Sequence, residues 1–282
     1  MLQSKEIQKT APSRVLRYHL GEPTPVLALA VHAGHEIRDE LVPRMAVSED
    51  LRLYEEDPLT DRFARKFPIA AWATASRFEV DLNREEEKAV YMTPDMAWGI
   101  HVWNDPPTPE MKKRSLDRWH EGQRFVDGLV DRAVGQFGYC ILLDFHSYNY
   151  QRDKEVPDWW AEEKPAINLG TREAHPRFRK VLDAILEAFG RIEWDGRPVT
   201  VRENFPFKGG YVHRRQQARH PDRVLVPSIE MKKIFMNEKE GGFLEPGFPK
   251  LLDETVIAVS GVMEQLHELL PDLTGRIPLE WR

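Results

Sequence analysis

The sequence predicts an α/β protein in which a mixed, mostly parallel sheet carries helices on both faces. Short apolar runs typical of buried strands recur along the chain. Longer segments with apolar residues at helical spacing lie between several of these runs. This alternation of short strands and longer helices favours a sheet that is covered on both sides. The chain has 282 residues, of which 41% are hydrophobic, so one large domain with a sizeable core is expected.

The expected elements follow in chain order. Strands are predicted at 26–31, 69–73, 139–145, 167–169, 199–201 and 224–231. Helices are predicted at 48–66, 109–137, 177–189 and 251–270. Ser48 is a suitable N-cap for the first helix, with acidic residues in its first turn. The second has the clearest ends, because Thr108 can cap it, Pro109 suits its first position and Gly138 stops it.

Two segments fall outside this pattern, although no linker-like break divides the single domain expected over residues 1–282. Residues 1–14 are polar and are expected to form a loosely docked tail without the apolar core of a secretory signal. Residues 148–166 form an irregular, aromatic insertion just after a candidate ligand. This insertion is either an active-site loop that acts as a lid or a surface loop that packs its own tryptophans.

Charge and cysteine content exclude several classes of function. The formal net charge of -6 argues against a general nucleic-acid or anionic-membrane surface. No apolar run approaches the roughly 20 residues of a membrane span. The single cysteine, Cys140, rules out an intramolecular disulfide and a cysteine-rich zinc site, and its apolar surroundings predict a buried, inert thiol. A cytoplasmic enzyme fits these observations.

Two histidines and a carboxylate follow the first predicted strand. His32 and Glu36 are four residues apart, so they point the same way if the chain turns helical after the strand. Imidazole nitrogen and carboxylate oxygen at this spacing suit a divalent metal ion. The alternative is that His32 only caps the strand or packs against it.

A third histidine, His146, follows the predicted strand at 139–145. In open α/β sheets, sites form at the carboxyl ends of strands, so His146 can converge with the residues that follow the first strand. Asp144 lies two residues earlier on the same strand face. It either orients an imidazole or, together with His146, only caps the strand.

Polar residues suited to binding an acidic substrate lie in two further segments. Arg77 and Arg84 offer planar forks that match a carboxylate, and Asn83 adds a neutral donor. Tyr211 follows the paired glycines at 209–210, which let the backbone approach a ligand closely, and it can donate a hydrogen bond to an oxyanion or a carboxylate. The alternatives are a solvated loop and an ordinary hairpin turn.

Glu230 lies within the last predicted strand, where a bare carboxylate is unusual. Beside a metal ion it can act as the general base that deprotonates water. The alternative is an ion pair with Lys232 or Lys233 at the surface.

Taken together, these residues resemble a known hydrolase plan. Their order along the chain resembles that of the zinc carboxypeptidase-type hydrolases, and the closer resemblance is to the N-formylglutamate amidohydrolase family. The motifs that carry the closer resemblance are His-Ala-Gly at 32–34, Val-Asp-Leu-Asn-Arg at 80–84, Asp-Phe-His-Ser at 144–147, Leu-Gly at 169–170 and Gly-Gly-Tyr at 209–211.

This resemblance implies a hydrolase-like α/β fold and one zinc ion per chain. The implied metal ligands are His32, Glu36 and His146, and Glu230 is implied to be the general base. The superfamily's metal motif is usually His-x-x-Glu, whereas one more residue separates His32 from Glu36 here, so His35 is an alternative second ligand.

The resemblance also implies a substrate class. Arg84, Asn83 and Arg77 would hold the carboxylates of an N-acyl acidic amino acid, with N-formyl-L-glutamate as the first candidate. The alternatives are a small-peptide or N-acetyl amino-acid hydrolase on the same fold, or a metal- or ligand-binding protein without turnover.

Overall fold

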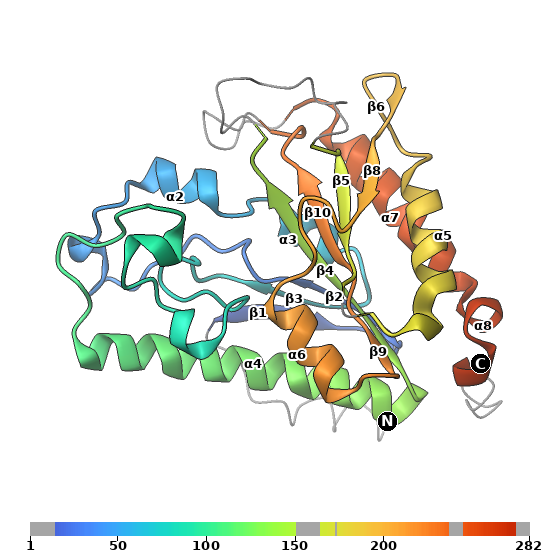
Figure 1. The fold of residues 1–282 in the computed structure, drawn as a ribbon, viewed down its shortest axis with the longest axis horizontal. Helices are drawn as coiled ribbons and strands as arrows, with labels where there is room; N and C mark the ends of the chain where they lie inside the picture. Colours follow the sequence, from blue (N-terminus) through green and yellow to red (C-terminus); the bar gives the residue numbers. More distant parts are fainter. Residues whose placement is uncertain (1–14, 151–163, 173, 237–244, 275–282) are drawn as a thin grey trace.

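The computed structural model describes residues 15–150, 164–172, 174–236 and 245–274, and its centre is an eight-stranded mixed sheet (Figure 1). The strands run in the order β1-β3-β2-β4-β10-β5-β8, with β9 beside β4. Their bounds are β1 Leu16–Leu20, β2 Val26–Ala30, β3 Ile69–Ala73, β4 Cys140–Tyr148, β5 Ile167–Gly170, β8 Val201–Glu203, β9 Val224–Leu225 and β10 Ser228–Lys232. Only the pairs β1–β3 and β10–β5 within this sheet are antiparallel, which confirms the predicted mostly parallel arrangement. A separate two-stranded sheet pairs β6 Glu193–Trp194 with β7 Arg197–Pro198.

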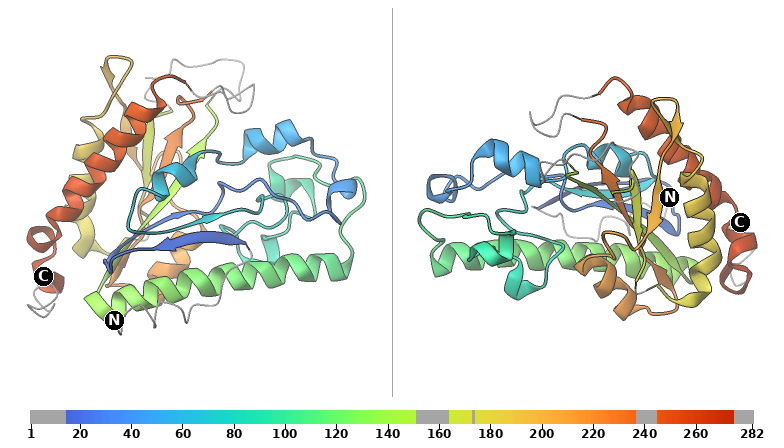
Figure 2. Two further views of the ribbon diagram at one scale, coloured as in Figure 1. Left: turned by 180° about the vertical axis from the view of Figure 1, so that it is seen from behind. Right: turned by 45° about the horizontal axis from the view of Figure 1, so that its top comes forward.

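Helices cover both faces of the sheet, as predicted: α4 lies on one side, and α5 and α7 lie on the other (Figure 2). The α-helices are α2 Glu49–Glu55, α3 Thr60–Ala64, α4 Pro109–Phe137, α5 Arg179–Phe189, α6 Tyr211–Arg219, α7 Phe248–Glu264, α8 Leu266–Leu269 and α9 Pro271–Thr274. Short 3-10 helices cover Val42–Arg44, Glu86–Lys88, Pro94–Ala97 and Pro176–Phe178. Alternate residues of β2 face the two layers: Val26 and Ala28 pack with α3, α5 and α7, whereas Leu27 and Leu29 pack with α4.

Helix α4 begins and ends where the sequence predicts. The Thr108 side chain accepts a hydrogen bond from the backbone of Met111, Pro109 occupies the first helical position, and Gly138 ends the helix at a φ of 81°. Within the described part of the chain, no helix is both long enough and apolar enough to cross a membrane.

The predicted helix at 48–66 is two helices. Ser48 caps α2 as expected, but α2 ends at Glu55 and α3 begins only at Thr60. Pro58 explains the break, because proline has no backbone N–H to donate and disfavours helical geometry in the residue before it, which is Asp57. The prediction of one continuous helix is therefore wrong, and the break places Asp57 beside the sheet.

Smaller differences concern element boundaries. The predicted strand at 224–231 is interrupted by Val226 and Pro227, so it forms β9 and β10. The predicted helix at 251–270 begins earlier, at Phe248, and is divided between α7 and α8. The tail at 1–14 and residues 151–163 of the aromatic insertion lie outside the described residues, so both expectations stay predictions.

Candidate metal centre and active-site cavity

A cavity of about 680 Å³ opens at the carboxyl ends of the central strands. Strands β2, β4 and β10 are parallel neighbours, so the residues at their carboxyl ends meet at one edge of the sheet. Glu230 pairs in register with His146, and His32 follows β2. The cavity is lined by seven of the residues that the sequence analysis selected, namely His32, Arg77, Asn83, Arg84, His146, Tyr211 and Glu230.

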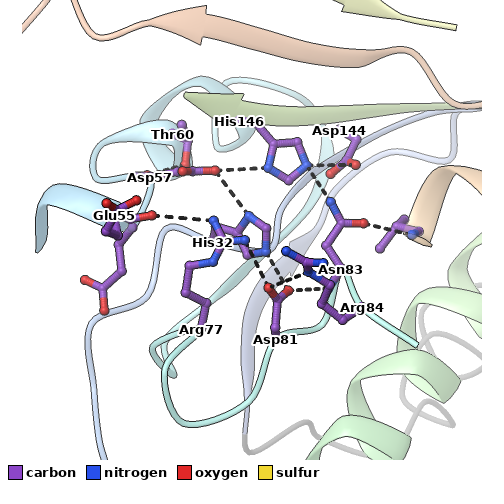
Figure 3. A network of polar contacts seen from close by, with 12 residues as sticks. His32, Glu55, Asp57, Thr60, Arg77, Asp81, Asn83, Arg84, Asp144 and His146 are labelled. Carbon is purple, nitrogen blue, oxygen red and sulfur yellow. Dashed lines mark hydrogen bonds and ion pairs between the residues drawn. The ribbon is translucent and has the colours of Figure 1, made fainter. Parts of the chain in front are cut away.

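Three buried side chains form a group that could hold a metal ion: His32, Asp57 and His146 (Figure 3). Oδ2 of Asp57 lies 3.3 Å from Nδ1 of His32 and 3.0 Å from Nδ1 of His146. Zinc bonds of 2.0–2.1 Å at tetrahedral angles would separate neighbouring ligand atoms by about 3.3 Å. The donor atoms and these two distances are therefore compatible with a divalent metal ion such as zinc.

A second carboxylate lies near the other ring nitrogen of each imidazole, the one that does not face Asp57. Nε2 of His32 lies 2.7 Å from Oδ1 of Asp81, and Nε2 of His146 lies 3.0 Å from Oδ2 of Asp144. With a metal ion in place of the Nδ1 proton, a carboxylate at Nε2 would favour the tautomer that keeps its proton there. The structure thus places Asp144 where it can orient an imidazole, and it adds Asp81 in the matching position.

Buried negative charge is concentrated around the two histidines. Burial alone would raise the pKa of Asp57, but hydrogen bonds to His146 and His32 outweigh it and hold this pKa well below its usual range. Burial likewise opposes ionisation of Asp81, yet the nearby charges of His32 and Arg77 hold its pKa well below the usual value. Both aspartates are therefore anions at neutral pH, which favours a cation between the histidines.

Glu230 has the properties of a group that exchanges protons near neutrality. Burial is the main cause that raises its pKa, His146 acts in the opposite direction, and the charges of Asp57 and Asp144 add to the rise, which brings the pKa to about 7. A carboxyl group with this pKa can both take and return a proton at neutral pH.

Glu36, an expected ligand, lies outside the group of His32, Asp57 and His146 that could hold a metal ion. The chain does not turn helical after His32; it makes a turn at residues 31–32, continues without regular structure, and Glu36 forms an isolated parallel bridge with Ala75. Its side chain is 64% exposed and lies 3.7 Å from Arg17. The four-residue spacing brings two side chains together only on a helix, so it does not apply here.

His35, the alternative second ligand, also lies outside the group. Its ring contacts the carboxylate of Glu56. Gly34, which lies between His32 and His35, packs closely against the backbone that follows β3. A Cβ at this position would lie only 2.4 Å from the carbonyl oxygen of Ala75. Glycine is therefore required by close backbone approach, and the turn directs His35 away from the cavity.

Asp57 is the member of this group that the sequence analysis missed. It lies in the break between α2 and α3, where its backbone N–H donates to the carbonyl of His32 at 3.0 Å. Thr60 Oγ1 donates to the carbonyl of Asp57 at 2.6 Å. The available signal was an acid directly before Pro58, within a segment otherwise patterned as a helix.

Arg77 lines the cavity, but other contacts occupy its guanidinium. Nη2 donates to Asp81 at 3.0 Å, Nε donates to the Tyr91 hydroxyl at 3.2 Å, and Nη1 reaches the carbonyl of Glu55 at 3.5 Å. The side chain is only 10% exposed. These contacts favour an interpretation in which Arg77 fixes Asp81, and through it His32, over the expected direct contact with substrate.

Arg84 is the more accessible of the two arginines. Its side chain is 35% exposed, and Nε lies 3.8 Å from Asp81. Trp98, which the sequence analysis did not select, supports it: the Arg84 guanidinium lies 5.6 Å from the centre of the indole ring. Trp98 lines the cavity and has a positive φ of 53°. Arg84 lines the cavity and is therefore a candidate to bind a carboxylate of the substrate.

Asn83 and Tyr211 join the cavity wall to helix α6. Oδ1 of Asn83 accepts a hydrogen bond from the backbone of Val212 at 2.9 Å, and its Nδ2 lies 3.4 Å from Nε2 of His146. The Tyr211 hydroxyl accepts a hydrogen bond from Arg215 at 3.3 Å. The Asn83 side chain is therefore already engaged in contacts within the protein. Tyr211 lines the cavity, and its hydroxyl is bonded to Arg215.

This fold and site define an α/β protein with a buried His–Asp–His group at the carboxyl ends of parallel strands, an arrangement suited to metal-assisted hydrolysis. Residues 24–236 match the family model described as N-formylglutamate amidohydrolase, and the chain belongs to this family. The match confirms the resemblance drawn from the sequence motifs.

Individual relatives agree with this assignment. The chain is 30% identical over 173 residues to an N-formylglutamate deformylase of Pseudomonas putida, a match that spans 56% of this chain and 62% of that relative. The crystal structure of an N-formylglutamate amidohydrolase from Ralstonia eutropha JMP134 has a TM-score of 0.70 at 18% identity, over 90% of this chain and 98% of that one. A gene product of Agrobacterium tumefaciens has a TM-score of 0.60 at 15% identity, over 92% and 96%. The structural likenesses show a shared fold.

Proposed function

We propose that the chain is a zinc-dependent amidohydrolase that acts on an N-acyl acidic amino acid. The first candidate reaction is hydrolysis of N-formyl-L-glutamate to formate and glutamate. The observation that carries the proposal is the presence of the His32, Asp57 and His146 group, Glu230 and Arg84 in one cavity of a chain from this family. A cytoplasmic location stays a prediction from composition.

One zinc ion per chain would be held by Nδ1 of His32, Nδ1 of His146 and a carboxylate oxygen of Asp57. When bound, zinc would polarise the amide carbonyl and lower the pKa of water. Asp81 contacts the outer nitrogen of His32 at 2.7 Å, and Asp144 lies 3.0 Å from the outer nitrogen of His146, so these carboxylates would help to keep the two rings in orientation.

Glu230 supplies the proton transfers in this proposal. Its carboxylate takes a proton from the attacking water as oxygen bonds to the amide carbon. The carboxylic acid so formed then gives this proton to the amide nitrogen as the carbon–nitrogen bond breaks. Burial raises the pKa of Glu230 above that of an ordinary carboxyl group, which helps it to hold the proton between the two transfers. A protein that only sensed a metal or a ligand would need no such group.

Cationic side chains at the cavity supply recognition of an acidic substrate. Arg84, Lys208 and Arg214 line it, although the protein as a whole carries a net charge of -6. Arg84 would bind one substrate carboxylate through its planar fork and so orient the amide toward Glu230. N-formyl-L-glutamate carries two carboxylates, which matches a cavity with several cations.

The test is a substrate panel combined with metal removal. We expect purified protein to contain close to one zinc per chain and to release formate fastest from N-formyl-L-glutamate. N-acetyl- and N-carbamoyl-L-glutamate and N-formyl-L-alanine should react more slowly, as measured by amine release. Treatment with a chelator should abolish turnover, and added zinc should restore it. Turnover that survives complete zinc removal, or none on any of these amides, would contradict the proposal.

A further inference from the structure

A buried lysine beside the cavity contacts the backbone that carries Asp57. Lys233 directly follows β10, is only 1% exposed and lines the cavity. Its ammonium donates to the carbonyl of Tyr54 at 2.6 Å and to the carbonyl of Glu56 at 2.7 Å. Burial of an ammonium is costly unless hydrogen bonds compensate it, so these two contacts are strong constraints on the segment.

The carbonyls bound by Lys233 belong to a segment that no strand supports. Helix α2 ends at Glu55, and its last carbonyls have no helical N–H to accept from. Asn149, which follows β4, donates to the carbonyl of Tyr54 at 2.7 Å. Arg77, which follows β3, reaches the carbonyl of Glu55 at 3.5 Å. Side chains that follow three strands of the sheet therefore bind three consecutive carbonyls just before Asp57.

We propose that Lys233 is a positioning residue that holds Asp57 at the distance from His32 and His146 that a metal ion requires. Lys233 lies three residues after Glu230, so one side chain ties the strand of the proposed base to the segment of the third ligand. This inference rests on the proposed function, because it concerns the zinc ligand Asp57.

The neighbouring residue offers a matched control. Lys232 is also fully buried, but it lies in β10 itself, and its ammonium lies 5.2 Å from the centre of the Tyr150 ring. It is not among the residues that line the cavity. Replacing either lysine by methionine removes a buried charge at similar volume, but only the change at Lys233 releases the carbonyls of Tyr54 and Glu56.

The experiment compares Lys233→Met, Lys232→Met and wild type in three measurements. These are zinc affinity, by competition with a chromophoric chelator, melting temperature, and kcat and KM on N-formyl-L-glutamate at saturating zinc. We expect Lys233→Met to weaken zinc binding by about 10–100-fold and to lower kcat at unchanged KM. Lys232→Met should keep wild-type zinc affinity whatever its melting temperature. Lys233→Arg should recover part of the zinc affinity, because a guanidinium can also donate to two carbonyls.

A double-mutant cycle with Asp57→Asn tests the route of the effect. If Lys233 acts through Asp57, then Lys233→Met should weaken zinc binding far less in the Asp57→Asn background. Full additivity would overturn the inference, as would wild-type zinc affinity in folded Lys233→Met, or a rise in KM alone, which would indicate contact with substrate.

Two further outcomes keep the test decisive. If Lys233→Met does not fold, Asn149→Leu removes the other donor to the Tyr54 carbonyl and must itself weaken zinc binding, or the inference falls. Wild-type protein that binds no zinc would overturn the proposed function and this inference together. Wild-type zinc binding that Lys233→Met retains overturns the inference alone.

Discussion

The two sides of the candidate metal centre are built differently. His32 and His146 lie at the carboxyl ends of β2 and β4, neighbouring parallel strands whose backbone hydrogen bonds fix their register. Asp57 lies outside the sheet, between the short helices α2 and α3, and its carboxylate faces the two histidines. Backbone hydrogen bonds of the sheet therefore position the histidines, whereas side chains such as Lys233 contact the segment that carries Asp57.

This difference shows how the work of the site is divided. Glu230 belongs to the strand-held side, because β10 pairs with β4 along its full length. A change at Glu230 should therefore remove a chemical step and leave the scaffold intact. A change at Asp57, or in the segment before it, should instead act on metal binding. The predictions below test this division, beginning with the largest expected effect.

The largest effect is expected for Glu230→Gln. Glutamine keeps the shape of the side chain but cannot accept the proton from water, so kcat should fall by about 10²–10⁴-fold. Zinc content and melting temperature should stay at wild-type values, because Glu230 is not a ligand in this proposal. Steady-state kinetics with parallel zinc analysis measures both. Loss of zinc together with activity would mean that Glu230 binds the metal, and the division between the two sides would fail.

The same variant has a pH signature. A general base works in its deprotonated form, so kcat/KM of the wild type should fall as pH falls through the pKa of Glu230, about 7. A bound cation favours the charged carboxylate and would move this limb to lower pH. The limb should vanish in Glu230→Gln, and a persistent limb would assign it to another group.

The second prediction compares Asp57→Asn with Glu36→Gln, which set the proposed ligand of the His32–Asp57–His146 group against the ligand expected from sequence. Asp57→Asn removes a charged ligand and should weaken zinc affinity by on the order of 10²-fold, since even residues behind the ligands contribute 10–100-fold. Glu36→Gln changes an exposed side chain and should leave zinc affinity and kcat unchanged. Zinc titration of both apo proteins measures the difference. The reverse result would restore Glu36 as the ligand and exclude Asp57.

The same contrast explains what could be predicted from sequence. His32, His146 and Glu230 follow or lie within apolar runs, and the rule that sites form at the carboxyl ends of parallel strands was enough to bring them together. The central strands β2 and β4 were readable because all their residues are buried, whereas the half-exposed strand β1 was not predicted. Asp57 could not be found this way, because its position depends on contacts with residues far away in the sequence, such as His32 and Lys233.

Two errors share one physical cause, which is the assumption of helix where the chain is not helical. Glu36 was expected beside His32 because four residues separate them, but the chain there is not helical and Glu36 bridges Ala75. Conversely, the segment 48–66 was expected as one helix, although Pro58 breaks it. Spacing arguments therefore hold only where the local backbone geometry is already established.

Arg77 shows a further limit: the residue type was informative, but its partners were not visible. An arginine near a candidate site suggested carboxylate binding, yet the structure gives Arg77 the internal partners Asp81 and Tyr91 and leaves Arg84 facing the cavity. Whether an arginine pairs with a carboxylate of the protein or with one of the substrate depends on which carboxylate lies near it in the folded structure.

The smallest effect is expected from a comparison of Arg84→Gln with Arg77→Gln. Arg84 is about one third exposed, so a lost contact with a substrate carboxylate should cost about 1–2 kcal/mol, or roughly a tenfold rise in KM for N-formyl-L-glutamate. The rise should be smaller for N-formyl-L-alanine, and kcat should barely change. Arg77→Gln instead removes the arginine that donates a hydrogen bond to the buried Asp81, so it should lower zinc affinity or melting temperature without changing the preference between the two substrates. Steady-state kinetics on both substrates, with zinc titration of both variants, separates these outcomes. A selective KM effect in Arg77→Gln and none in Arg84→Gln would exchange the two roles, and it would mean that the internal pair of Arg77 and Asp81 opens when substrate binds.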